Sequence, residues 1–219
     1  KFLKLLILSK LNIQFNRNKY QNFHLVEKYN KFINESLSTD FKAGMLDIHS
    51  SYKSYDKSSS PIIGINPGAK YGSAKIWYPE EYAKVAIELS SRYKIIIFGS
   101  LNEKKIADEI ESLLIKKGVS NYENLSGKTS ISELINIISS IDLFITGDSG
   151  PMHLAASLQI PSVTIFGPTI DTETSQWMNK KSVLVKKNLD CQPCMKRVCP
   201  LEHHNCMKLI KADDILTAI

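Results

Sequence analysis

Residues 147–153 read Gly147-Asp148-Ser149-Gly150-Pro151-Met152-His153, and this heptapeptide is the clearest structural signal in the chain. It follows a short apolar run, Asp142–Thr146, and opens a segment that reads Leu154-Ala155-Ala156-Ser157-Leu158. Ser149 is a residue type that caps helix N termini, and Pro151 suits the first helical turn, where its missing N–H is not needed. The pattern predicts a strand, a tight glycine turn and a helix in direct succession.

The start of this expected helix has the features of an anion site. The positive end of a helix presents free backbone N–H groups to a phosphate. Asp148 stands beside that end, within reach of whatever the phosphate carries, and the imidazole of His153 follows closely. A diphosphate attached to a polyhydroxylated group fits this arrangement, so Asp148, Ser149, Gly150 and His153 are candidate binding residues.

The composition is that of an ordinary globular chain of 219 residues, with 43% hydrophobic and 23% charged residues. The net charge of +6 is concentrated in residues 1–60, which hold 10 Lys and Arg against 5 Asp and Glu; residues 61–219 hold 18 against 17. A basic front piece suits an anionic partner such as a phosphorylated glycolipid, a membrane surface or nucleic acid, although a solvated lysine-rich surface explains it more simply.

No apolar run approaches the roughly 18–20 residues that cross a membrane. The front run Phe2–Leu8 is short, is interrupted by Lys4 and precedes no cleavage-site pattern, so we do not interpret it as a signal peptide. The chain begins with Lys1 in the middle of a pattern. We therefore expect it to be a fragment of a longer protein.

A polar stretch, residues 50–61, has the composition of a flexible linker and divides the chain in two. Before it, the expected elements are a helix over about residues 2–10, a short strand over about 12–16 and a helix over about 22–36. These three elements are too few to bury a stable core by themselves. We expect a front piece, residues 1–60, and a larger domain, residues 61–219.

After Pro61 the chain alternates apolar runs with helical patterns. The runs that read as buried strands are Ile62–Ile65, Lys94–Phe98, Tyr122–Leu125, Asp142–Thr146, Ser162–Phe166 and Val183–Val185, and the helical patterns span about 79–91, 102–116, 130–139 and 150–158. This alternation predicts an α/β fold, a doubly wound, Rossmann-like parallel sheet. Ligands bind such sheets outside the carboxyl ends of the strands, and three glycine-containing loops follow these ends.

The first of these loops reads Asn66-Pro67-Gly68-Ala69-Lys70-Tyr71-Gly72-Ser73-Ala74-Lys75-Ile76-Trp77. Gly68 and Gly72 let the backbone approach a ligand closely, and Lys75 offers a mobile charge for a phosphate. The spacing matches neither the P-loop nor the dinucleotide-binding glycine pattern. An ordinary turn before the next helix would explain the loop alone, but its place on the same sheet edge as Asp148 favours a phosphate site.

The second loop, Phe98-Gly99-Ser100-Leu101-Asn102-Glu103, presents an acidic residue. Glu103 could bind a ribose hydroxyl, as acids do in nucleotide-binding folds, or could simply favour a helix N terminus, which is the simpler interpretation. The turn Ser126-Gly127-Lys128-Thr129-Ser130 precedes a helix in which Ser130 and Glu133 have capping-box spacing. The backbone around Thr129 could border a base.

All four cysteines lie within 16 residues, as Cys191-x2-Cys194-x4-Cys199-x6-Cys206. Thiolates two residues apart suit tetrahedral zinc, but six residues separate the last pair, which departs from zinc-ribbon spacing. Reduced cysteines that only pack are the leading alternative, because disulfides are disfavoured in the cytosol. Structural zinc on these four side chains is therefore one hypothesis, and free thiols are the other.

Together these motifs resemble glycosyltransferase family 9, the lipopolysaccharide heptosyltransferases. The residues that carry the resemblance are Pro67-Gly68-Ala69, Gly72, Ala74-Lys75, Trp77, Phe98-Gly99-Ser100, Gly147-Asp148-Ser149-Gly150, Met152-His153, Ala155-Ala156, Phe166-Gly167-Pro168-Thr169 and His204-Asn205-Cys206-Met207. The resemblance is strong over residues 61–219. Residues 1–50, with His24-x2-Glu27-Lys28-Tyr29, look like the end of a preceding domain.

The resemblance implies a GT-B architecture, in which two Rossmann-like domains face each other across a cleft and the second binds most of the donor. Residues 1–60 would be a remnant of the N-terminal acceptor domain with its linker, and residues 61–219 the C-terminal nucleotide-sugar domain. The implied reaction transfers L-glycero-D-manno-heptose, with inversion, from ADP-heptose to the inner core of lipopolysaccharide. The implied location is the cytoplasm, with peripheral contact at the inner membrane and no nucleic-acid partner.

The same resemblance implies roles for the candidate residues. Lys75 would neutralise the diphosphate leaving group, and backbone N–H groups at Ser149 and Gly150 would hold phosphate oxygens. Asp148 would bind heptose hydroxyls, while His153 would support the loop or a phosphate. The remaining donor-binding residues are Gly72, Glu103 and Thr129, the last two beside the ribose and the adenine. A lysine and a helix terminus can stabilise a departing diphosphate, so no metal cofactor is required.

One departure from the family concerns catalysis. The family's general base is an aspartate near the start of the first domain, and no carboxylate in residues 1–60 stands in a glycine-rich strand-end loop that could replace it. We therefore expect this chain to bind donor but not to turn over by itself. Two alternatives stay open: an enzyme of this family or of GT-B-like fold that uses another sugar nucleotide, and a zinc-stabilised binding module without enzymatic activity.

Overall fold

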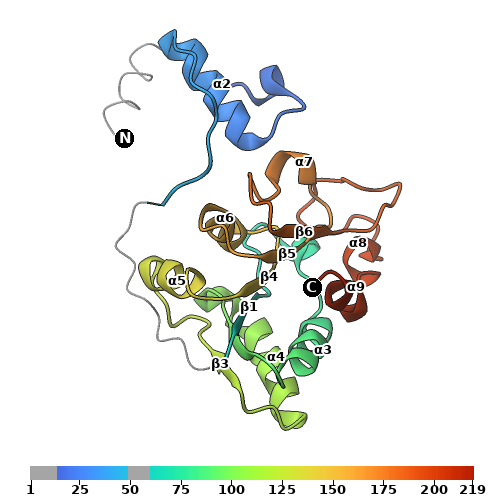
Figure 1. The fold of residues 1–219 in the computed structure, drawn as a ribbon. Helices are drawn as coiled ribbons and strands as arrows, with labels where there is room; N and C mark the ends of the chain where they lie inside the picture. The colour runs from blue at the N-terminus through green and yellow to red at the C-terminus, as the bar shows by residue number, and fades with distance from the viewer. Residues whose placement is uncertain (1–13, 49–59) are drawn as a thin grey trace.

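The six apolar runs form one sheet in the computed structural model, which describes residues 14–48 and 60–219. The strands are β1 (Ile62–Asn66), β2 (Lys94–Ile97), β3 (Tyr122–Asn124), β4 (Leu143–Gly147), β5 (Ser162–Ile165) and β6 (Ser182–Val185). Every neighbouring pair is parallel, and the order across the sheet is β3-β2-β1-β4-β5-β6 (Figure 1). The predicted α/β fold with a parallel sheet is confirmed.

The direction of strand addition reverses between β1 and β4. These two strands pair in register, with Ile63 opposite Leu143 and Asn66 opposite Thr146. In an open parallel sheet, the connections at such a point leave toward opposite faces, and a crevice opens at the carboxyl ends of the two strands. The loops that follow β1 and β4 therefore begin side by side at that crevice.

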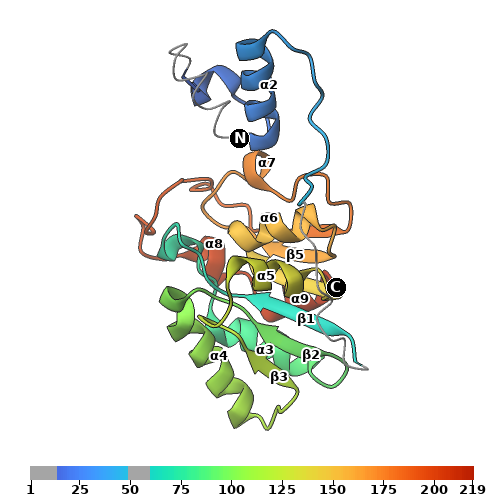
Figure 2. The same ribbon diagram turned by 90° about the vertical axis from the view of Figure 1, so that its left-hand side faces the viewer.

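Helices cover both faces of the sheet (Figures 1 and 2). One face carries α3 (Pro79–Leu89), α4 (Lys104–Lys116), α8 (Asn205–Lys208) and α9 (Ala212–Thr217), and the other carries α5 (Ile131–Ile138) and α6 (Gly150–Ser157). Successive strand side chains divide between two cores, so Ile63 and Ile65 pack with the first set of helices and Ile62 with the second. Burial on both faces explains why the strands read as continuous apolar runs.

Several short helices escape prediction from periodicity. They are η2 (Ser73–Lys75), η3 (Leu101–Glu103), α7 (Asp171–Thr174), α8 and α9. Helices of this length make fewer than two turns, so an apolar repeat of 3.6 residues cannot become visible in their sequences. None of the helices in the described parts of the chain combines the length and the apolar character that a membrane crossing requires.

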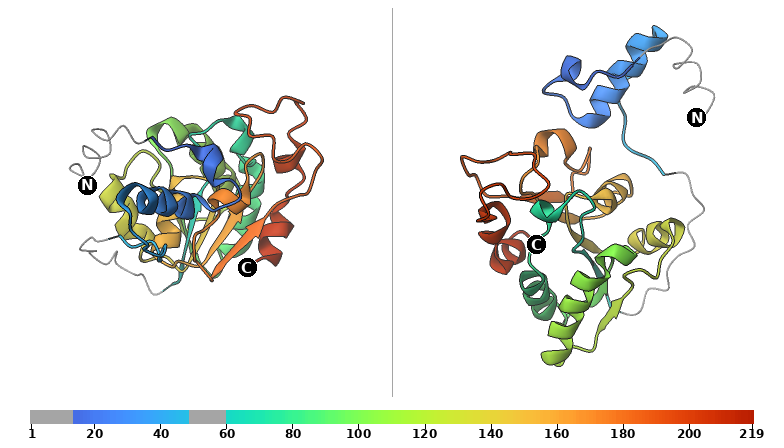
Figure 3. Two further views of the ribbon diagram at one scale, coloured as in Figure 1. Left: turned by 90° about the horizontal axis from the view of Figure 1, so that it is seen from above. Right: turned by 180° about the vertical axis from the view of Figure 1, so that it is seen from behind.

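The front piece contributes η1 (Arg17–Tyr20) and α2 (Leu25–Leu37), and α2 lies outside the sheet next to α7 (Figures 1 and 3). The helix predicted over 22–36 is confirmed, and it begins at Leu25 because His24 and Glu27 form a capping box. The strand predicted over 12–16 is wrong for residues 14–16, where Asn16 caps η1 instead. The helix predicted over 2–10 lies outside the described residues.

A buried ion pair connects α2 to the sheet domain. The Lys28 Nζ lies 2.7 Å from the Glu173 Oε1 of α7, and the Lys28 side chain is only 1% exposed. The Nε2 of His24, at the start of α2, lies 2.9 Å from the carbonyl oxygen of Ser175. The front piece therefore packs against the end of the sheet that carries β5 and β6.

Candidate functional site

A small polar network joins the carboxyl ends of β1 and β4. The Asn66 Nδ2 donates to the Ser149 Oγ at 3.3 Å and to the Thr146 Oγ1 at 3.4 Å, and the two hydroxyls are 3.2 Å apart. Ser149 occupies the N-cap position of α6, as predicted, but its side chain does not cap the helix. Pro151 has no N–H, and the Met152 N–H donates to the Ser149 carbonyl oxygen at 3.2 Å. Among the described residues, the backbone N–H groups of Ser149 and Gly150 are therefore the donors that remain for an anion.

Lys75 is paired with Asp148 beside this network. The Lys75 Nζ lies 2.5 Å from the Asp148 Oδ2 and 3.2 Å from the Asp148 carbonyl oxygen. The Thr169 Oγ1 donates to the same carboxylate oxygen at 2.6 Å. The side chains of Lys75 and Asp148 are 12% and 6% exposed. The two residues that were expected to meet the diphosphate and the sugar thus bind each other in this structure.

A pocket of about 440 Å³ lies at the same edge of the sheet. Glu103, Thr129, Ser149 and Gly150, which sequence patterns place on three separate loops, line it together with Lys70. The volume is in the range of small-molecule sites. The predicted residues that do not line this pocket are Gly72, Lys75, Asp148 and His153.

Glu103 caps a helix and also lines the pocket, while its predicted contact with a ribose stays a prediction. Its carboxylate accepts a hydrogen bond from the Ser100 N–H at 2.7 Å and so caps η3, as the simpler interpretation predicted. The same carboxylate fills the space beside Gly68, where an added Cβ would clash with it. Glu103 therefore contributes to helix stability and also forms part of the pocket wall.

His153 lies in α6 and is partly buried. Burial lowers the pKa of His153 below its ordinary value of 6.5; the charge of Asp148 acts against this, and His24 and Lys75 lower the pKa further. The ring is therefore neutral at pH 7, with one nitrogen as a donor and the other as an acceptor. His24, at the start of α2, is near enough for its charge to affect the pKa of His153, so α2 begins in the neighbourhood of this ring.

The loop formed by residues 189–204, called the cysteine loop below, packs on the loop that carries Lys75. The Ala74 N–H donates to the Arg197 carbonyl at 3.0 Å. Gly72 has a φ of +158° and faces the same carbonyl, with no room for a Cβ. In this structure the group that comes close to Gly72 is the backbone of Arg197, and the predicted approach of Gly72 to a ligand stays a prediction.

The four cysteines surround one small void. Cys206 is buried and Cys191, Cys194 and Cys199 are partly buried, and all four line a cavity of about 20 Å³. Burial, and the neighbouring thiols, raise the pKa of Cys206 to about 11. Within residues 14–48 and 60–219, no set of three or more His, Cys, Asp or Glu side chains is arranged so that it could hold a metal ion. Structural zinc stays a prediction.

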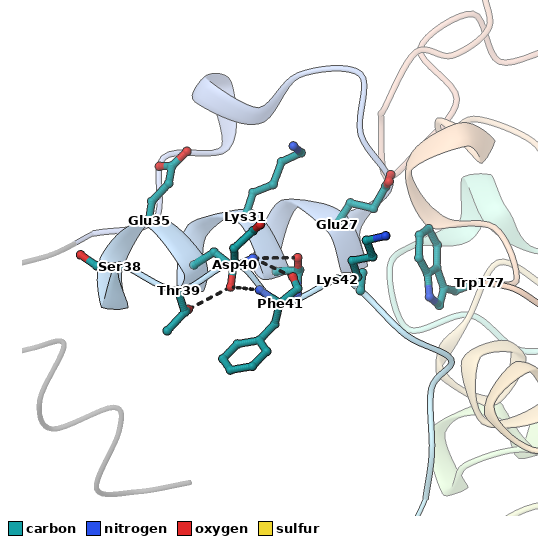
Figure 4. Close-up of a pocket in the computed structure, with 12 residues that line it drawn as sticks. Glu27, Lys31, Glu35, Ser38, Thr39, Asp40, Phe41, Lys42 and Trp177 are labelled. Carbon is teal, nitrogen blue, oxygen red and sulfur yellow. Dashed lines mark hydrogen bonds between the residues drawn. The ribbon is translucent and has the colours of Figure 1, made fainter.

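A pocket of about 700 Å³ lies against α2, away from the sheet edge (Figure 4). Its wall combines α2, the segment 38–43 and Trp177. Asn34, which lines it, already bonds the N–H and the carbonyl of Phe41 and the hydroxyl of Thr39. None of the residues predicted to bind a ligand lines this pocket, so we place the candidate site at the ends of β1 and β4.

Sequence reasoning misses four residues at this edge. Asn66 and Thr169 hold Ser149 and Asp148 in place. Asn66 opens the first glycine-containing loop, and Thr169 ends the motif Phe166-Gly167-Pro168-Thr169. Their positions in these two motifs could have identified them as site residues. The other two missed residues are cations, Lys70 in the pocket lining and Arg197 beside the Lys75 loop.

The sequence profile of glycosyltransferase family 9 (heptosyltransferase) matches residues 8–205. This chain belongs to glycosyltransferase family 9. Lipooligosaccharide heptosyltransferase 2 of Campylobacter jejuni (serotype O:2) is 42% identical to it over 209 residues, which are 92% of this chain and 65% of the relative. Lipopolysaccharide heptosyltransferase 2 of Escherichia coli K12 is 34% identical over 128 residues, 58% of this chain and 37% of the relative. This family 9 chain therefore spans at most 65% of the length of these two curated relatives.

Solved family 9 structures have the same fold. The E. coli ADP-heptose lps heptosyltransferase II aligns with a TM-score of 0.63 and 28% identity over 74% of this chain and 46% of that one. The family 9 glycosyltransferase of Veillonella parvula aligns with a TM-score of 0.76 and 21% identity over 94% of this chain and 60% of that one. These likenesses and the strand order confirm the expected Rossmann-like sheet of a GT-B glycosyltransferase.

Proposed function

We propose that this family 9 protein acts as a heptosyltransferase II, which transfers L-glycero-D-manno-heptose, with inversion, from ADP-heptose to the inner core of lipopolysaccharide. The names of the relatives and of the E. coli structure support the choice of sugar, nucleotide and acceptor. One structural observation carries the proposal. The N terminus of α6, which no side chain caps, opens into the same pocket as Glu103 and Thr129 at the point where the strand order reverses.

The site accounts for the donor part by part. Thr129 and Glu103 line the pocket where the adenine and the ribose would bind, and backbone N–H groups at Ser149 and Gly150 would hold phosphate oxygens. The buried pair formed by Lys75 and Asp148 lies next to this lining, because Asp148 directly precedes Ser149 in the chain. In the proposed complex, Lys75 faces the leaving diphosphate and Asp148 the heptose hydroxyls. Positive groups of this kind stabilise a departing anion, so the proposed reaction uses no metal cofactor.

Two further roles belong to the same proposal. The neutral ring of His153 supports the Asp148 loop or a phosphate, and Gly72 lets the Lys75 loop pass close to its neighbours. All of these groups bind the donor, and we assign the general base to none of the described residues. The proposed location is the cytoplasm, with contact at the inner membrane, where the basic front piece would meet an anionic glycolipid acceptor.

Nucleotide-dependent thermal unfolding of the 219-residue chain tests the donor assignment. A ligand at 100 times its dissociation constant stabilises a folded protein by roughly 2.7 kcal/mol, which is a readily measured shift. ADP should raise the unfolding temperature more than UDP or GDP at equal concentration. A larger shift with UDP or GDP would mean that the protein uses a sugar nucleotide other than ADP-heptose. If no nucleotide raises the unfolding temperature, a binding module that does not bind sugar nucleotides is the better explanation.

A transfer assay tests the reaction itself. The protein is incubated with ADP-heptose and a lipopolysaccharide core acceptor, and the acceptor is analysed by mass spectrometry for the added heptose. Because none of the described residues is assigned as the general base, we expect the 219-residue chain to bind ADP-heptose without transferring the sugar. Formation of the extended acceptor would support the proposed reaction and would refute the expectation that this chain cannot turn over by itself. If the protein binds ADP but transfers only another sugar, it is a family 9 enzyme with a different donor sugar.

A further inference from the structure

The charge at the proposed diphosphate site is lower than the sequence suggests. The Lys75 ammonium is in contact with the Asp148 carboxylate at 2.5 Å and with the Asp148 carbonyl oxygen at 3.2 Å. Both side chains are largely buried, so the attraction between them is weakly screened by solvent. The pair is close to neutral as a unit. A diphosphate that leaves with several negative charges needs a further cation nearby.

Arg197 of the cysteine loop is in the right place to supply this cation. Its guanidinium carbon lies 5.3 Å from the centre of the Tyr71 ring, and the Lys75 Nζ lies 4.8 Å from the same ring. Both cations therefore lie against one aromatic side chain of the loop that leads to Lys75. This distance is typical of cation–π contacts, which orient a guanidinium without neutralising it.

The backbone holds Arg197 in this position. The Arg197 carbonyl accepts the Ala74 N–H at 3.0 Å, directly before Lys75 in the sequence, and Gly72 leaves space for it. The Tyr71 hydroxyl donates to the carbonyl of Met195 at 2.8 Å, two residues before Arg197. The cysteine loop and the Lys75 loop are thus joined at two points, so the side chain of Arg197 starts from a defined place beside Lys75.

The guanidinium of Arg197 is also available to a ligand. Arg197 is exposed, and no carboxylate among the described residues forms an ion pair with it. A guanidinium presents a planar fork of donors that matches two phosphate oxygens. Lys75, by contrast, already donates to two oxygens of Asp148.

We infer that Arg197 binds the diphosphate of the nucleotide-sugar donor, as a second cation beside the Lys75–Asp148 pair. This inference rests on the proposed function, because it names a further group for the same donor. It also assigns a role to the cysteine loop, which positions this guanidinium at the edge of the donor site.

Calorimetric titration of the 219-residue chain with ADP, and with adenosine by competition, tests the inference. Arg197→Gln should weaken ADP binding by about 10–100-fold, the effect of losing hydrogen bonds to a charged group, and should leave adenosine binding unchanged. Arg197→Lys should bind ADP with an intermediate affinity, because it keeps the charge and loses the fork. Lys196→Gln is the matched control, since it removes an exposed positive charge from the adjacent position.

The outcomes separate this inference from the proposed function. If the unchanged chain does not bind ADP, the proposed function fails. If it binds ADP and Arg197→Gln has no effect, or no more effect than Lys196→Gln, the role of Arg197 is wrong and the proposed function stands. The unfolding temperature of each variant is measured in parallel. If Arg197→Gln unfolds, the ADP affinity of the folded Arg197→Lys variant is measured instead. An affinity equal to that of the unchanged chain overturns the inference.

Discussion

The Lys75 ammonium and the Asp148 carboxylate lie 2.5 Å apart, although 73 positions separate them in the sequence. Lys75 arrives from the loop after β1 and Asp148 from the end of β4, so the pair joins the two strands at which the sheet order reverses. Both side chains are largely withdrawn from solvent. Each charge therefore depends on the other for its stability in the folded protein.

Loss of this pair should be strongly destabilising. Asp148→Asn leaves the ammonium of Lys75 buried without its carboxylate, and we expect a loss of about 3–5 kcal/mol in the free energy of unfolding, measured with denaturant. The control is Asp108→Asn, which changes the same side chain in an exposed pair with Lys104 and should have little effect. Equal losses in the two variants would contradict the assignment of a buried, mutually dependent pair.

Gly72 should not tolerate any side chain. Gly72→Ala places a Cβ against the Arg197 carbonyl at a φ of +158°, so we expect a loss of about 1–3 kcal/mol and weaker ADP binding. Gly150→Ala is the control for stability, because, apart from its chain neighbours and the backbone of α6, no atom of the described residues lies within 4 Å of an added Cβ there. Thermal unfolding measures both variants, and a Gly72→Ala protein as stable as Gly150→Ala would show that the two loops are not in contact.

The imidazole of His153 should titrate below pH 6.5, since burial is the main cause of its lowered pKa. The unfolded chain then binds a proton more readily than the folded chain, so stability is complete above 6.5 and falls as the pH decreases toward the folded pKa. Histidine NMR signals followed against pH give the folded value. His153→Gln should make stability less dependent on pH in this window, and an unchanged dependence would assign it to other groups.

Lys28 should be essential for the attachment of α2. Lys28→Met removes the ammonium that contacts Glu173, and we expect a loss of about 3–5 kcal/mol together with faster proteolysis within residues 14–48. Lys31→Met, on an exposed position of the same helix, should stay within about 0.5 kcal/mol of the unchanged chain. Similar proteolysis patterns for both variants would mean that the ion pair does not hold the helix.

The three thiols of the cysteine loop and the thiol of Cys206 in α8 should differ in reactivity. Because burial raises the pKa of Cys206 to about 11, this thiol stays protonated at pH 8 and should react with iodoacetamide more slowly than Cys191, Cys194 and Cys199 in metal-free protein. The structural-zinc hypothesis predicts about one zinc per chain and protection of all four thiols until a chelator is added. Zinc-free protein as purified, with three rapidly modified cysteines, would support free thiols instead.

The regular elements were predictable because their patterns are local. Buried parallel strands read as apolar runs, and the heptapeptide after β4 combines a turn with a helix start, so all six strands and the start of α6 were predicted within two residues. The strand expected over 12–16 failed at residues 14–16, where the N-cap side chain of Asn16 starts a 3-10 turn that overrides an apolar pattern. The four-residue helices were missed because they make only about one turn, so the 3.6-residue repeat by which helices are recognised does not recur in them.

The residues of the candidate site were predictable from the sequence, but the contacts between them were not. Glycines, a lysine and an aspartate at strand ends carry their chemistry in their residue types, so Lys75, Glu103, Asp148 and Gly150 could be named without a structure. Their partners could not. The contacts of Lys75 with Asp148, of Gly72 with Arg197 and of His24 with Ser175 join segments far apart in the chain, and such pairings depend on strand order and helix packing.

By itself, the amino-acid sequence determined the strands, the main helices and the family, and it predicted the edge of the sheet that we propose as the ligand site. Only the tertiary structure decided which charges remain available there, since it placed the carboxylate of Asp148 on Lys75 and left Arg197 open to solvent. The physical reason is that hydrophobic periodicity and backbone capping act between neighbours in the chain. Charge pairing acts through space, and the distances that govern it exist only after the sheet has brought β1, β4 and the cysteine loop together.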